Sequence, residues 1–407
     1  MLRDKLSRFS QHLDGPQNKP VEHDQYDRSR LIAEALGGEI IDGPAGTYVK
    51  ITRNFDTTYR HGRMTLDNLP GEVDLRGDRF YRELPPTPIE ASRLLFFDTE
   101  TTGLGGTGTV PFLLGFGSIT PGGFQVRQYF LPDYPDEAAM LEDARLEITA
   151  ETVLVSYNGK SFDIPILTDR LILHRVERNL TFAGHLDLLH ATRRLFRRRL
   201  QSCTLGNIER NVLEFIRVDD LPGELVPAVY FNWLATSETA QLDKVIEHNR
   251  HDIVSLYFLL YHINTTLARP GETLADADDL YSVARIYERR REHDRVRQLL
   301  DDCRHLADGN RRAPLLWLQS LACKRTGHLD RATAIWEELS GGNTPEAFAA
   351  LIELAKYHEH RSRRYRLALE MAERARRIGS EGLARREDLA KRIGRLQSKI
   401  ECRAASK

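Results

Sequence analysis

The sequence of 407 residues predicts an α/β domain, with a mixed sheet covered by helices, followed by an all-α region of helical repeats. Two observations predict this order. From about residue 93, short apolar runs of strand length alternate with amphipathic stretches, which is typical of a sheet covered by helices. After about residue 268 these runs stop, and the remaining chain shows only helical periodicity.

The composition is globular and the charge is balanced. Hydrophobic residues make up 41% of the chain, and 58 basic residues against 59 acidic ones give a net charge of −1. This balance excludes a uniformly basic coat protein or an acidic tail as the main function, but not a local basic surface. The four cysteines form no CxxC pair, which argues against a disulfide framework or a zinc site. No apolar leader or membrane-length run is present, so we expect a soluble cytoplasmic protein without a membrane partner.

The elements of the first domain follow from apolar runs and turn residues. Residues 1–90 are polar and interrupted by prolines, and we expect an irregular N-terminal extension with one strand near residues 46–52. The α/β domain is expected over residues 91–268 and begins with a buried strand, RLLFFDTE. Strands at 111–119 and 124–130 continue it as a meander, because a short turn joins them. A helix, a strand, a helix and a strand are then expected at 136–149, 152–157, 164–173 and 183–187.

The C-terminal part repeats itself. The motifs HDRV, LDRA and YRLA begin at residues 293, 329 and 365, which are 36 residues apart, and each follows an amphipathic helix. Each unit is therefore expected to be a helical hairpin, and the units resemble tetratricopeptide repeats, whose period is about 34 residues. We expect the repeats over residues 275–380. Within residues 381–407, an apolar stripe predicts a capping helix, formed by Leu389, Ile393, Leu396 and Ile400.

Four carboxylates in the first domain predict a metal site. Asp98 and Glu100 end a buried strand and project to the same side of the sheet, because side chains alternate along a strand. Alone, this pair is also typical of an ordinary strand end at the surface. Asp163 follows the next buried strand, and Asp252 lies in a long helix with His248 one turn earlier on the same face. Such oxygen donors favour Mg²⁺ or Mn²⁺ and suit a two-metal phosphodiester site, where one cation activates a water and the other stabilises the leaving oxygen.

The blocks around these acids resemble a known superfamily. DTETTGL (98–104), NGKSFD (158–163) and HNRHD (248–252) resemble the three motifs of the DEDD (DnaQ-like) 3′-5′ exonuclease superfamily, which has a ribonuclease H-like fold. More narrowly, residues 91–268 resemble the YprB-like ribonuclease H-like family, including the blocks HLDLLHATRRLF and DDLPGELVPAVYFNWL. Domains of that family often accompany helical repeats.

The resemblance implies a function and a set of ligands. The protein is expected to be a 3′-5′ exonuclease acting on single-stranded or frayed ends of DNA or RNA. Two divalent cations, Mg²⁺ or Mn²⁺, are expected as cofactors. Their ligands would be the four matching acids, Asp98, Glu100, Asp163 and Asp252.

His248 departs from the superfamily pattern, in which the general base is a histidine five residues before the last aspartate or a tyrosine four residues before it. Glu247 lies at the first position here, and His248 lies at the second. A neutral imidazole can accept a proton from water, so we expect His248 to act as a base or to position the water. A structural helix histidine is the alternative. We expect Asp187 to cap a helix or to support the site from behind rather than to bind metal.

Three groups of residues are candidates for substrate contact. Thr102 and Leu104 resemble the superfamily's substrate-side residues after the first motif, although Leu104 suits the core equally well. Asn158 and Lys160 precede Asp163 in a turn that phosphate or sugar can approach; a plain Asn-Gly turn and a solvated lysine are the alternatives. A basic face on the helix expected over residues 188–199 is predicted to contact phosphates, unless it is merely solvated; it consists of Arg193, Arg194, Arg197 and Arg198, with His190.

Two functions of different classes remain open from the sequence. The first is the metal-dependent exonuclease, with the helical repeats supplying protein contacts or guiding the substrate. The second is a nucleic-acid-binding or scaffold protein with weak or lost nuclease activity, acting mainly through its repeats. The presence of all four acids favours the enzyme, whereas the unusual position of His248 keeps the alternative open.

Overall fold

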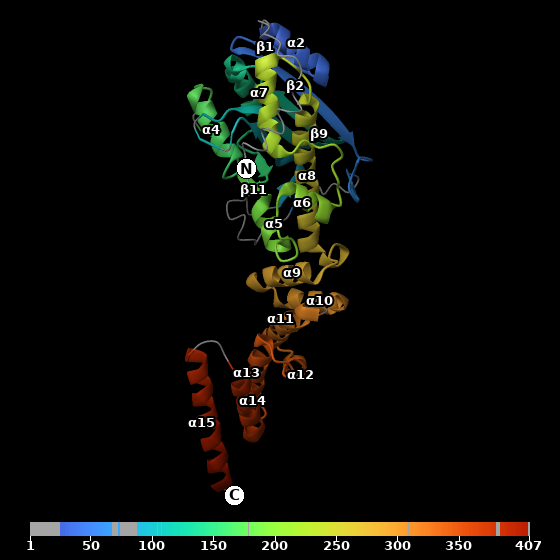
Figure 1. The fold of residues 1–407 in the computed structure, drawn as a ribbon. Coiled ribbons are helices and arrows are strands. Elements are labelled where there is room, and N and C mark those ends of the chain that lie inside the picture. The colour runs from blue at the N-terminus through green and yellow to red at the C-terminus, as the bar shows by residue number, and fades with distance from the viewer. Residues whose placement is uncertain are drawn as a thin grey trace. The chain divides into compact units, whose positions relative to one another are not determined.

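The structure is a computed structural model that describes residues 25–66, 72–73, 88–103, 105–106, 108–177, 179–307, 309–379 and 383–405. The chain divides into two compact units. The first comprises Met1–Ala191 and Cys203–His262, and the second comprises Thr192–Ser202 and Ile263–Lys407. The first unit is a mixed α/β structure and the second is helical (Figure 1), which confirms the predicted fold class.

A seven-stranded sheet with the order β1-β2-β9-β8-β7-β10-β11 forms the centre of the first unit. Its strands are β1 (Glu39–Gly43), β2 (Gly46–Asp56), β7 (Leu94–Thr101), β8 (Pro111–Thr120), β9 (Gly123–Phe130), β10 (Val153–Ser156) and β11 (Gly184–Asp187). The antiparallel strands β7, β8 and β9 form the predicted meander, and β10 and β11 run parallel to β7. The carboxyl ends of β7, β10 and β11 therefore lie at one edge, where open α/β sheets usually carry their sites. Two pairs of two-residue strands lie between β2 and β7 in sequence: β3 (Arg60–His61) with β4 (Met64–Thr65), and β5 (Glu72–Val73) with β6 (Ile89–Glu90).

The N-terminal segment belongs to this sheet. After α2 (Gln25–Leu36), β1 and β2 pair with each other, and β2 pairs with β9 from Val49 to Asp56. Ile32, Tyr48 and Val49 are buried in the main core. An irregular extension with a single short strand was predicted here, so the described residues 25–66 differ from that expectation. The physical reason is that the partner strand β9 lies about 70 residues later, and local apolar periodicity carries no signal for such pairing.

Helices cover the sheet of the first unit. They are α3 (Glu137–Ala144), α4 (Asp163–Leu173), α5 (Leu188–Phe196), α6 (Leu205–Ile208), α7 (Val226–Thr236) and α8 (Leu242–Ala268), with a π-helical turn, η6 (Glu209–Leu213). Short 3₁₀ turns are η3 (Ala91–Arg93), η4 (Tyr134–Asp136), η5 (Arg145–Glu147) and η7 (Gly223–Leu225). Helix α8 packs closely on β8, because a Cβ added at Gly115 would lie 2.2 Å from Oδ1 of Asn249 and 2.3 Å from Cδ1 of Ile253. The absence of a side chain at Gly115 thus allows α8 to approach the sheet.

The second unit consists of helix pairs. Its main helices are α9 (Ala277–Arg289), α10 (His293–Asp302), α11 (Arg312–Arg325), α12 (Leu329–Leu339), α13 (Pro345–His360), α14 (Tyr365–Ile378) and α15 (Leu383–Ala405), with 3₁₀ turns η8 (Pro270–Glu272), η9 (Arg304–Leu306) and η10 (Gly309–Arg311). Helices α10, α12 and α14 begin at the first residues of the three repeated motifs, so each motif opens the second helix of a pair. In α15, Leu389, Ile393 and Leu396 are buried in the cluster that also contains residues of α12, α13 and α14, whereas Ile400 is half-buried.

Glu359 ties α15 to α13. Its side chain has no exposed surface and accepts hydrogen bonds from Nη1 of Arg392 at 2.6 Å and from Nε of Arg395 and Nζ of Lys399, both at 2.8 Å. Burial alone would raise the pKa of Glu359, but the hydrogen bonds from Arg395 and Lys399 outweigh it and lower this pKa to about 2. The carboxylate is therefore charged in the folded protein at all but strongly acidic pH.

We predict that this ion-pair cluster makes the helical unit sensitive to acid. Because the pKa of Glu359 is lower in the folded chain, its contribution is complete above the ordinary value of 4.5 and is lost as the pH falls toward about 2. The loss amounts to at most about 3 kcal/mol. Urea unfolding followed across this pH range should show a weaker pH dependence for Glu359→Gln than for the wild type. Glu370→Gln, at an exposed position of α14, is the matched control, and equal pH dependence in both variants would contradict the prediction.

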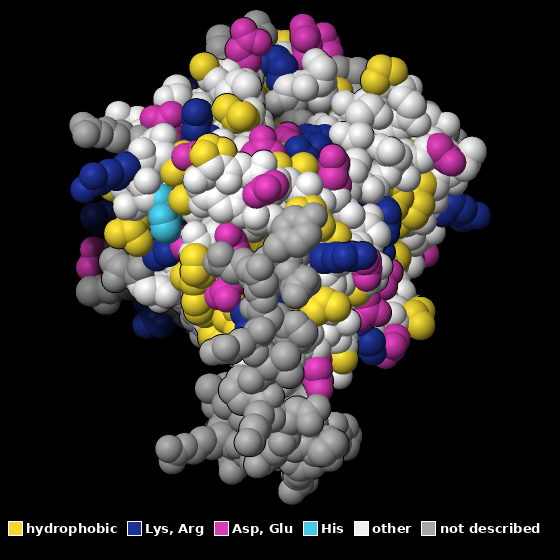
Figure 2. Space-filling view, turned by 90° about the horizontal axis from the view of Figure 1, so that it is seen from above, with side chains coloured by type: hydrophobic (Ala, Val, Ile, Leu, Met, Phe, Trp, Pro, Cys, Tyr) yellow, Lys and Arg dark blue, Asp and Glu magenta, His cyan; other side chains and the backbone are white. Residues whose placement is uncertain are grey.

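Charges of both signs are mixed over the surface of the first unit near α2, β1 and α7. Figure 2, which views the molecule from that end, shows acidic, basic and apolar side chains interspersed. Among the described residues, no helix has the length and apolar character needed to cross a membrane.

Candidate active site

The structure brings together the four acids that the sequence singled out. Asp98 and Glu100 lie near the end of β7, Asp163 is the first residue of α4 after the neighbouring strand β10, and Asp252 lies on α8. The pKa values of Asp98 and Glu100 both lie well above their usual ranges. Burial is the largest cause, and the negative charges of Asp252 and Asp163 add to it. Burial also raises the pKa of Asp163, to about 6. Carboxyls that repel each other in this way favour a bound cation.

Neutral side chains fix two of these acids. Nδ2 of Asn249, on α8, donates to Oδ2 of Asp98 at 2.8 Å. Gln128, a buried residue of β9, orients Asn249 by donating to its Oδ1 at 2.8 Å. Thr99 donates from its hydroxyl to Oδ1 of Asp163 at 2.5 Å. The site therefore has a preformed supporting layer of the kind that orients metal ligands.

The donor atoms fit a hard divalent cation. Glu100, His248 and Asp252 each offer one ligand atom within 4.8 Å of the others. Asp98 and Asp163 add two more carboxylates to this group. The negative charges of Asp252, Asp163 and Glu100 all act on Asp98. Carboxylate oxygens at this density are typical of Mg²⁺ or Mn²⁺ sites.

His248 lies between two carboxylates. Its Nδ1 is 3.0 Å from Oδ1 of Asp220, and its Nε2 is 3.8 Å from Oδ2 of Asp252. In the tautomer in which Nδ1–H donates to Asp220, the lone pair of Nε2 lies on the side of Asp252. This arrangement allows His248 to accept a proton at the acid cluster.

Among the described residues, Arg217 brings a positive charge into contact with this cluster. Nη2 of Arg217 donates to Oδ1 of Asp252, and its Nη1 lies 3.4 Å from Oδ2 of Asp220. Glu209 binds the same guanidinium from the other side through two hydrogen bonds, at 2.6 and 2.8 Å. The candidate active site thus contains a Glu209–Arg217–Asp252 chain of alternating charge, with Glu209 buried and Asp252 partly exposed.

Asp187 supports the turn that precedes Asp163. Its carboxylate accepts hydrogen bonds from the backbone N–H of Asn158 at 2.9 Å, of Lys160 at 3.3 Å and of Leu189 at 3.1 Å. The last contact caps α5, which agrees with the helix-cap interpretation of Asp187. Asn158 has a φ of 70°, as in the Asn-Gly turn given as the alternative to a substrate contact.

The other substrate-side candidates lie in two places. Thr102 closes the loop after β7, because its hydroxyl accepts from N–H of Val110 at 3.0 Å and its own N–H donates to the Val110 carbonyl at 2.9 Å. Leu104 lies outside the described residues. The turn after β10 contains Asn158 and Lys160 and leads directly into Asp163.

The basic residues of α5 and the following turn are not in the same unit as the acids. Arg193, Arg197 and Arg198 are exposed, and Arg194 is half-buried. Residues 192–202 belong to the second unit, where the guanidinium of Arg198 lies 4.3 Å from the ring centroid of Tyr281. The acids all lie in the first unit.

Several residues of the site were not predicted. Asn249 lies three residues before Asp252 on the same helix face, so helical spacing alone was enough to indicate it. Arg217 and Asp220 lie in a loop between η6 and η7, where no periodic pattern points to an acid cluster. Thr99 and Gln128 are buried polar residues on strands, and only their partners reveal why they are there.

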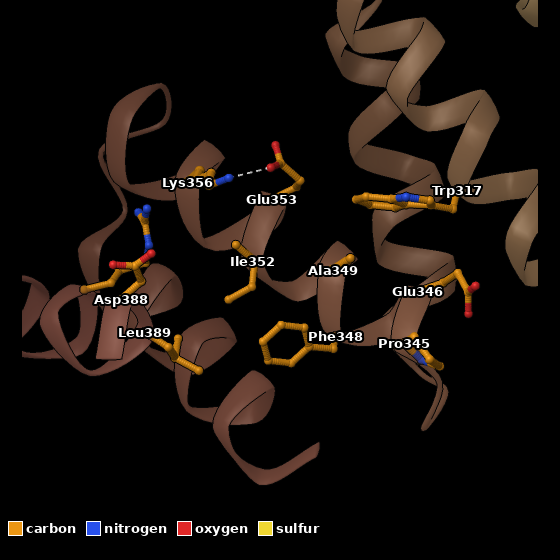
Figure 3. Close-up of a pocket in the computed structure, with 11 residues that line it drawn as sticks. Trp317, Pro345, Glu346, Phe348, Ala349, Ile352, Glu353, Lys356, Asp388 and Leu389 are labelled. Carbon is orange, nitrogen blue, oxygen red and sulfur yellow. Dashed lines mark hydrogen bonds and ion pairs between the residues drawn. The ribbon is translucent and has the colours of Figure 1, made fainter. Parts of the chain in front are cut away.

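A groove of about 480 Å³ lies in the second unit (Figure 3). Its apolar lining includes Trp317 of α11, Phe348 and Ile352 of α13, and Leu389 of α15. Lys356, also in the lining, donates to Oε1 of Glu353 at 2.7 Å. The helical unit therefore has a mixed apolar and charged surface of its own.

Comparisons with known proteins agree with this fold and site. Residues 95–264 match the family model described as the RNase H superfamily, a segment that includes all four acids and every strand from β8 to β11. Fold and site thus define a ribonuclease H-like domain of nuclease type, a class of hydrolase that acts on nucleic acid and generally uses divalent metals. The chain is 32% identical over 326 residues to the uncharacterized protein YprB of Bacillus subtilis (strain 168), an alignment that covers 79% of this chain and 78% of that protein. The chain therefore belongs to the YprB-like ribonuclease H-like family.

Proposed function

We propose that the protein is a metal-dependent 3′-5′ exonuclease that hydrolyses phosphodiester bonds at the ends of DNA or RNA. The observation that carries this proposal is the cluster of Asp98, Glu100, Asp163 and Asp252. Burial raises the pKa of Asp98, Glu100 and Asp163, and the charges of Asp252 and Asp163 raise those of Asp98 and Glu100 further. The order of these acids in the DTETTGL, NGKSFD and HNRHD blocks supports the exonuclease type.

In this proposal the four acids would hold two divalent cations, Mg²⁺ or Mn²⁺, and the chemistry that these would supply is activation of the attacking water and stabilisation of the leaving oxygen. His248 accepts the proton of the water at Nε2, and Asp220 holds the opposite nitrogen in its protonated form. Asn249 and Thr99 keep two of the acids oriented. Thr102, Leu104, Asn158 and Lys160 are proposed to contact the terminal nucleotides from the loops beside the acids.

The test uses purified protein and oligonucleotides labelled at either end, as DNA and as RNA, in Mn²⁺ or in EDTA. A 5′ label should give a descending ladder, whereas a 3′ label should appear at once in a mononucleotide. A 3′-phosphate block should slow the reaction, and circular single strands should resist it. Cleavage of circles would show an endonuclease instead. No shortening of any linear substrate in Mn²⁺ would contradict nuclease function and favour a binding or scaffold protein.

The exposed arginines are proposed to track the phosphate backbone. We predict that Arg193→Gln with Arg197→Gln lowers the slope of log affinity against log salt by about 1.4 for single strands, since each phosphate contact contributes about 0.7. Fluorescence anisotropy in EDTA measures binding without hydrolysis. The control is Arg376→Gln with Arg377→Gln, which removes the same charge from exposed positions of α14. An equal slope in both double variants would show that Arg193 and Arg197 face only solvent.

The helical unit is proposed to contact a protein partner or to guide the substrate. Its paired helices resemble tetratricopeptide repeats, and the groove of Figure 3 provides apolar surface with Glu353 and Lys356 beside it. The test uses the full-length protein, in which the substitutions Phe348→Ala and Ile352→Ala alter the lining of the groove. Slower hydrolysis in these variants would support substrate guidance by the groove, whereas unchanged nuclease rates would exclude it.

A further inference from the structure

Arg217 is a buried arginine at the acid cluster to which the proposed mechanism gives no role. Its side chain is 9% exposed, and that of its partner Glu209 is 1% exposed. Nε and Nη2 of the arginine donate to the two carboxylate oxygens of Glu209 at 2.8 and 2.6 Å. A bidentate pair of this kind fixes both the position and the plane of the guanidinium.

Glu209 is itself held from behind. The hydroxyl of Ser255, on α8, donates to Oε1 of Glu209, and Nε2 of His61 lies 2.8 Å from that hydroxyl. His61 is fully buried and stacks on Phe215, with ring centroids 3.7 Å apart. Glu209 opens the π-helical turn η6, a geometry that is frequent at functional sites. These contacts anchor Arg217 to the body of the first unit, so it is not a loosely attached surface cation.

The front of the guanidinium faces the candidate active site. Nη2 donates to Oδ1 of Asp252, and Nη1 lies 3.3 Å from Nδ1 of His248 and 3.4 Å from Oδ2 of Asp220. Arg217 therefore touches one proposed metal ligand, the proposed base and the carboxylate that orients this base. Its charge is permanent, because a guanidinium keeps its proton at any physiological pH.

We propose that Arg217 is a positioning residue that acts as the resident cation of the acid cluster. It holds Asp252 in place through Oδ1, partly neutralises the four acids, and opposes the binding of a divalent cation by repulsion. Arg217 thus sets how tightly the site binds metal. This inference rests on the proposed function only in that the divalent cation is taken to bind at these same acids.

The test is calorimetric titration of the full-length protein with Mn²⁺ in the absence of nucleic acid. Arg217→Gln is expected to bind Mn²⁺ about tenfold more tightly than the wild type, because a positive charge beside the ligands has been removed. Arg210→Gln, at an exposed arginine of the turn η6 that also contains Glu209, should bind Mn²⁺ like the wild type. Since Arg217→Gln leaves Glu209 buried without its partner, the double variant Glu209→Gln/Arg217→Gln removes both charges together and is measured in parallel.

A second readout separates positioning from a purely structural role. At saturating Mn²⁺, Arg217→Gln should reduce kcat by about tenfold or more with little change in KM for the oligonucleotide, because Asp252 and Asp220, the carboxylate that orients His248, are no longer held. Equal Mn²⁺ affinity in the wild type, Arg217→Gln and the double variant overturns the inference, even if melting temperatures differ. If the wild type degrades no oligonucleotide while Arg217→Gln still binds Mn²⁺ more tightly, the exonuclease proposal fails. The inference that Arg217 weakens metal binding at the acid cluster is then still supported.

Discussion

Asp98→Asn is expected to abolish exonuclease activity, with a rate at least about 10³-fold below that of the wild type at saturating Mn²⁺. Asp98 belongs to the acid cluster, since burial and then the charges of Asp252, Asp163 and Glu100 raise its pKa. An amide of equal size keeps the contact with Asn249 but removes a charged ligand, and loss of such electrostatic groups typically costs two to three orders of magnitude or more. The rate of mononucleotide release from a 3′-labelled oligonucleotide measures the loss.

Stability should change in the opposite sense in this variant. Because buried like charges destabilise the metal-free protein, the melting temperature of Asp98→Asn in EDTA should equal or exceed that of the wild type. The rise in melting temperature on adding Mn²⁺ should be smaller, since a cation that binds only the folded state stabilises it in proportion to its affinity. Asp169→Asn, at an exposed position of α4, is the matched control. Full activity in Asp98→Asn, or an equal Mn²⁺ effect in both variants, would contradict the assignment of Asp98.

Gly115→Ala is expected to damage both stability and activity although it adds only one methyl group. Gly115 lies directly opposite Asp98 in the pairing of β7 and β8, and a Cβ there would lie 2.2 Å from Oδ1 of Asn249. Either α8 moves away from the sheet or Asn249 leaves Asp98. Overpacking of this kind typically costs about 1–3 kcal/mol, and a displacement of about 1 Å at a catalytic group can cost about 10²-fold in rate.

Gly122→Ala is the control for this substitution. Gly122 lies in the turn between β8 and β9, where an added Cβ meets no atom of the described residues within 4 Å. Urea unfolding gives the change in stability, and oligonucleotide hydrolysis well below the melting temperature gives the change in rate. If Gly115→Ala matches Gly122→Ala in both measurements, the close packing of α8 on β8 does not position the site.

The acids could be predicted from the sequence because each follows a local pattern. Asp98 and Glu100 end an apolar run, Asp163 begins a helix after another run, and Asp252 lies one helical turn after His248. The repeat motifs were equally local, and the structure begins α10, α12 and α14 at their first residues. Patterns within about ten to twenty residues located the acids, whereas similarity at a spacing of 36 residues located the repeats.

The supporting contacts could not be predicted because they join distant parts of the chain. Gln128 reaches Asn249 across 121 positions, and Asn249 reaches Asp98 across 151. Arg217 lies in a loop, where charge is ordinarily solvated, and only the fold shows that it is buried against Glu209. The pairing of β2 with β9 is hidden for the same reason. Local pattern thus located the proposed ligands, whereas the layer that orients them depends on tertiary structure.

The position of β2 beside β9 has a consequence for how this domain is dissected experimentally. A gene fragment starting at residue 91 matches the apparent domain boundary, but it would leave β9 as an outer strand with its backbone N–H and C=O groups unpaired. It would also lack His61, which contacts Ser255 behind Glu209. Such a fragment would be prone to edge-to-edge association, and its inactivity would say nothing about the chemistry of the acids. Recombinant versions of the first unit therefore need to start ahead of α2.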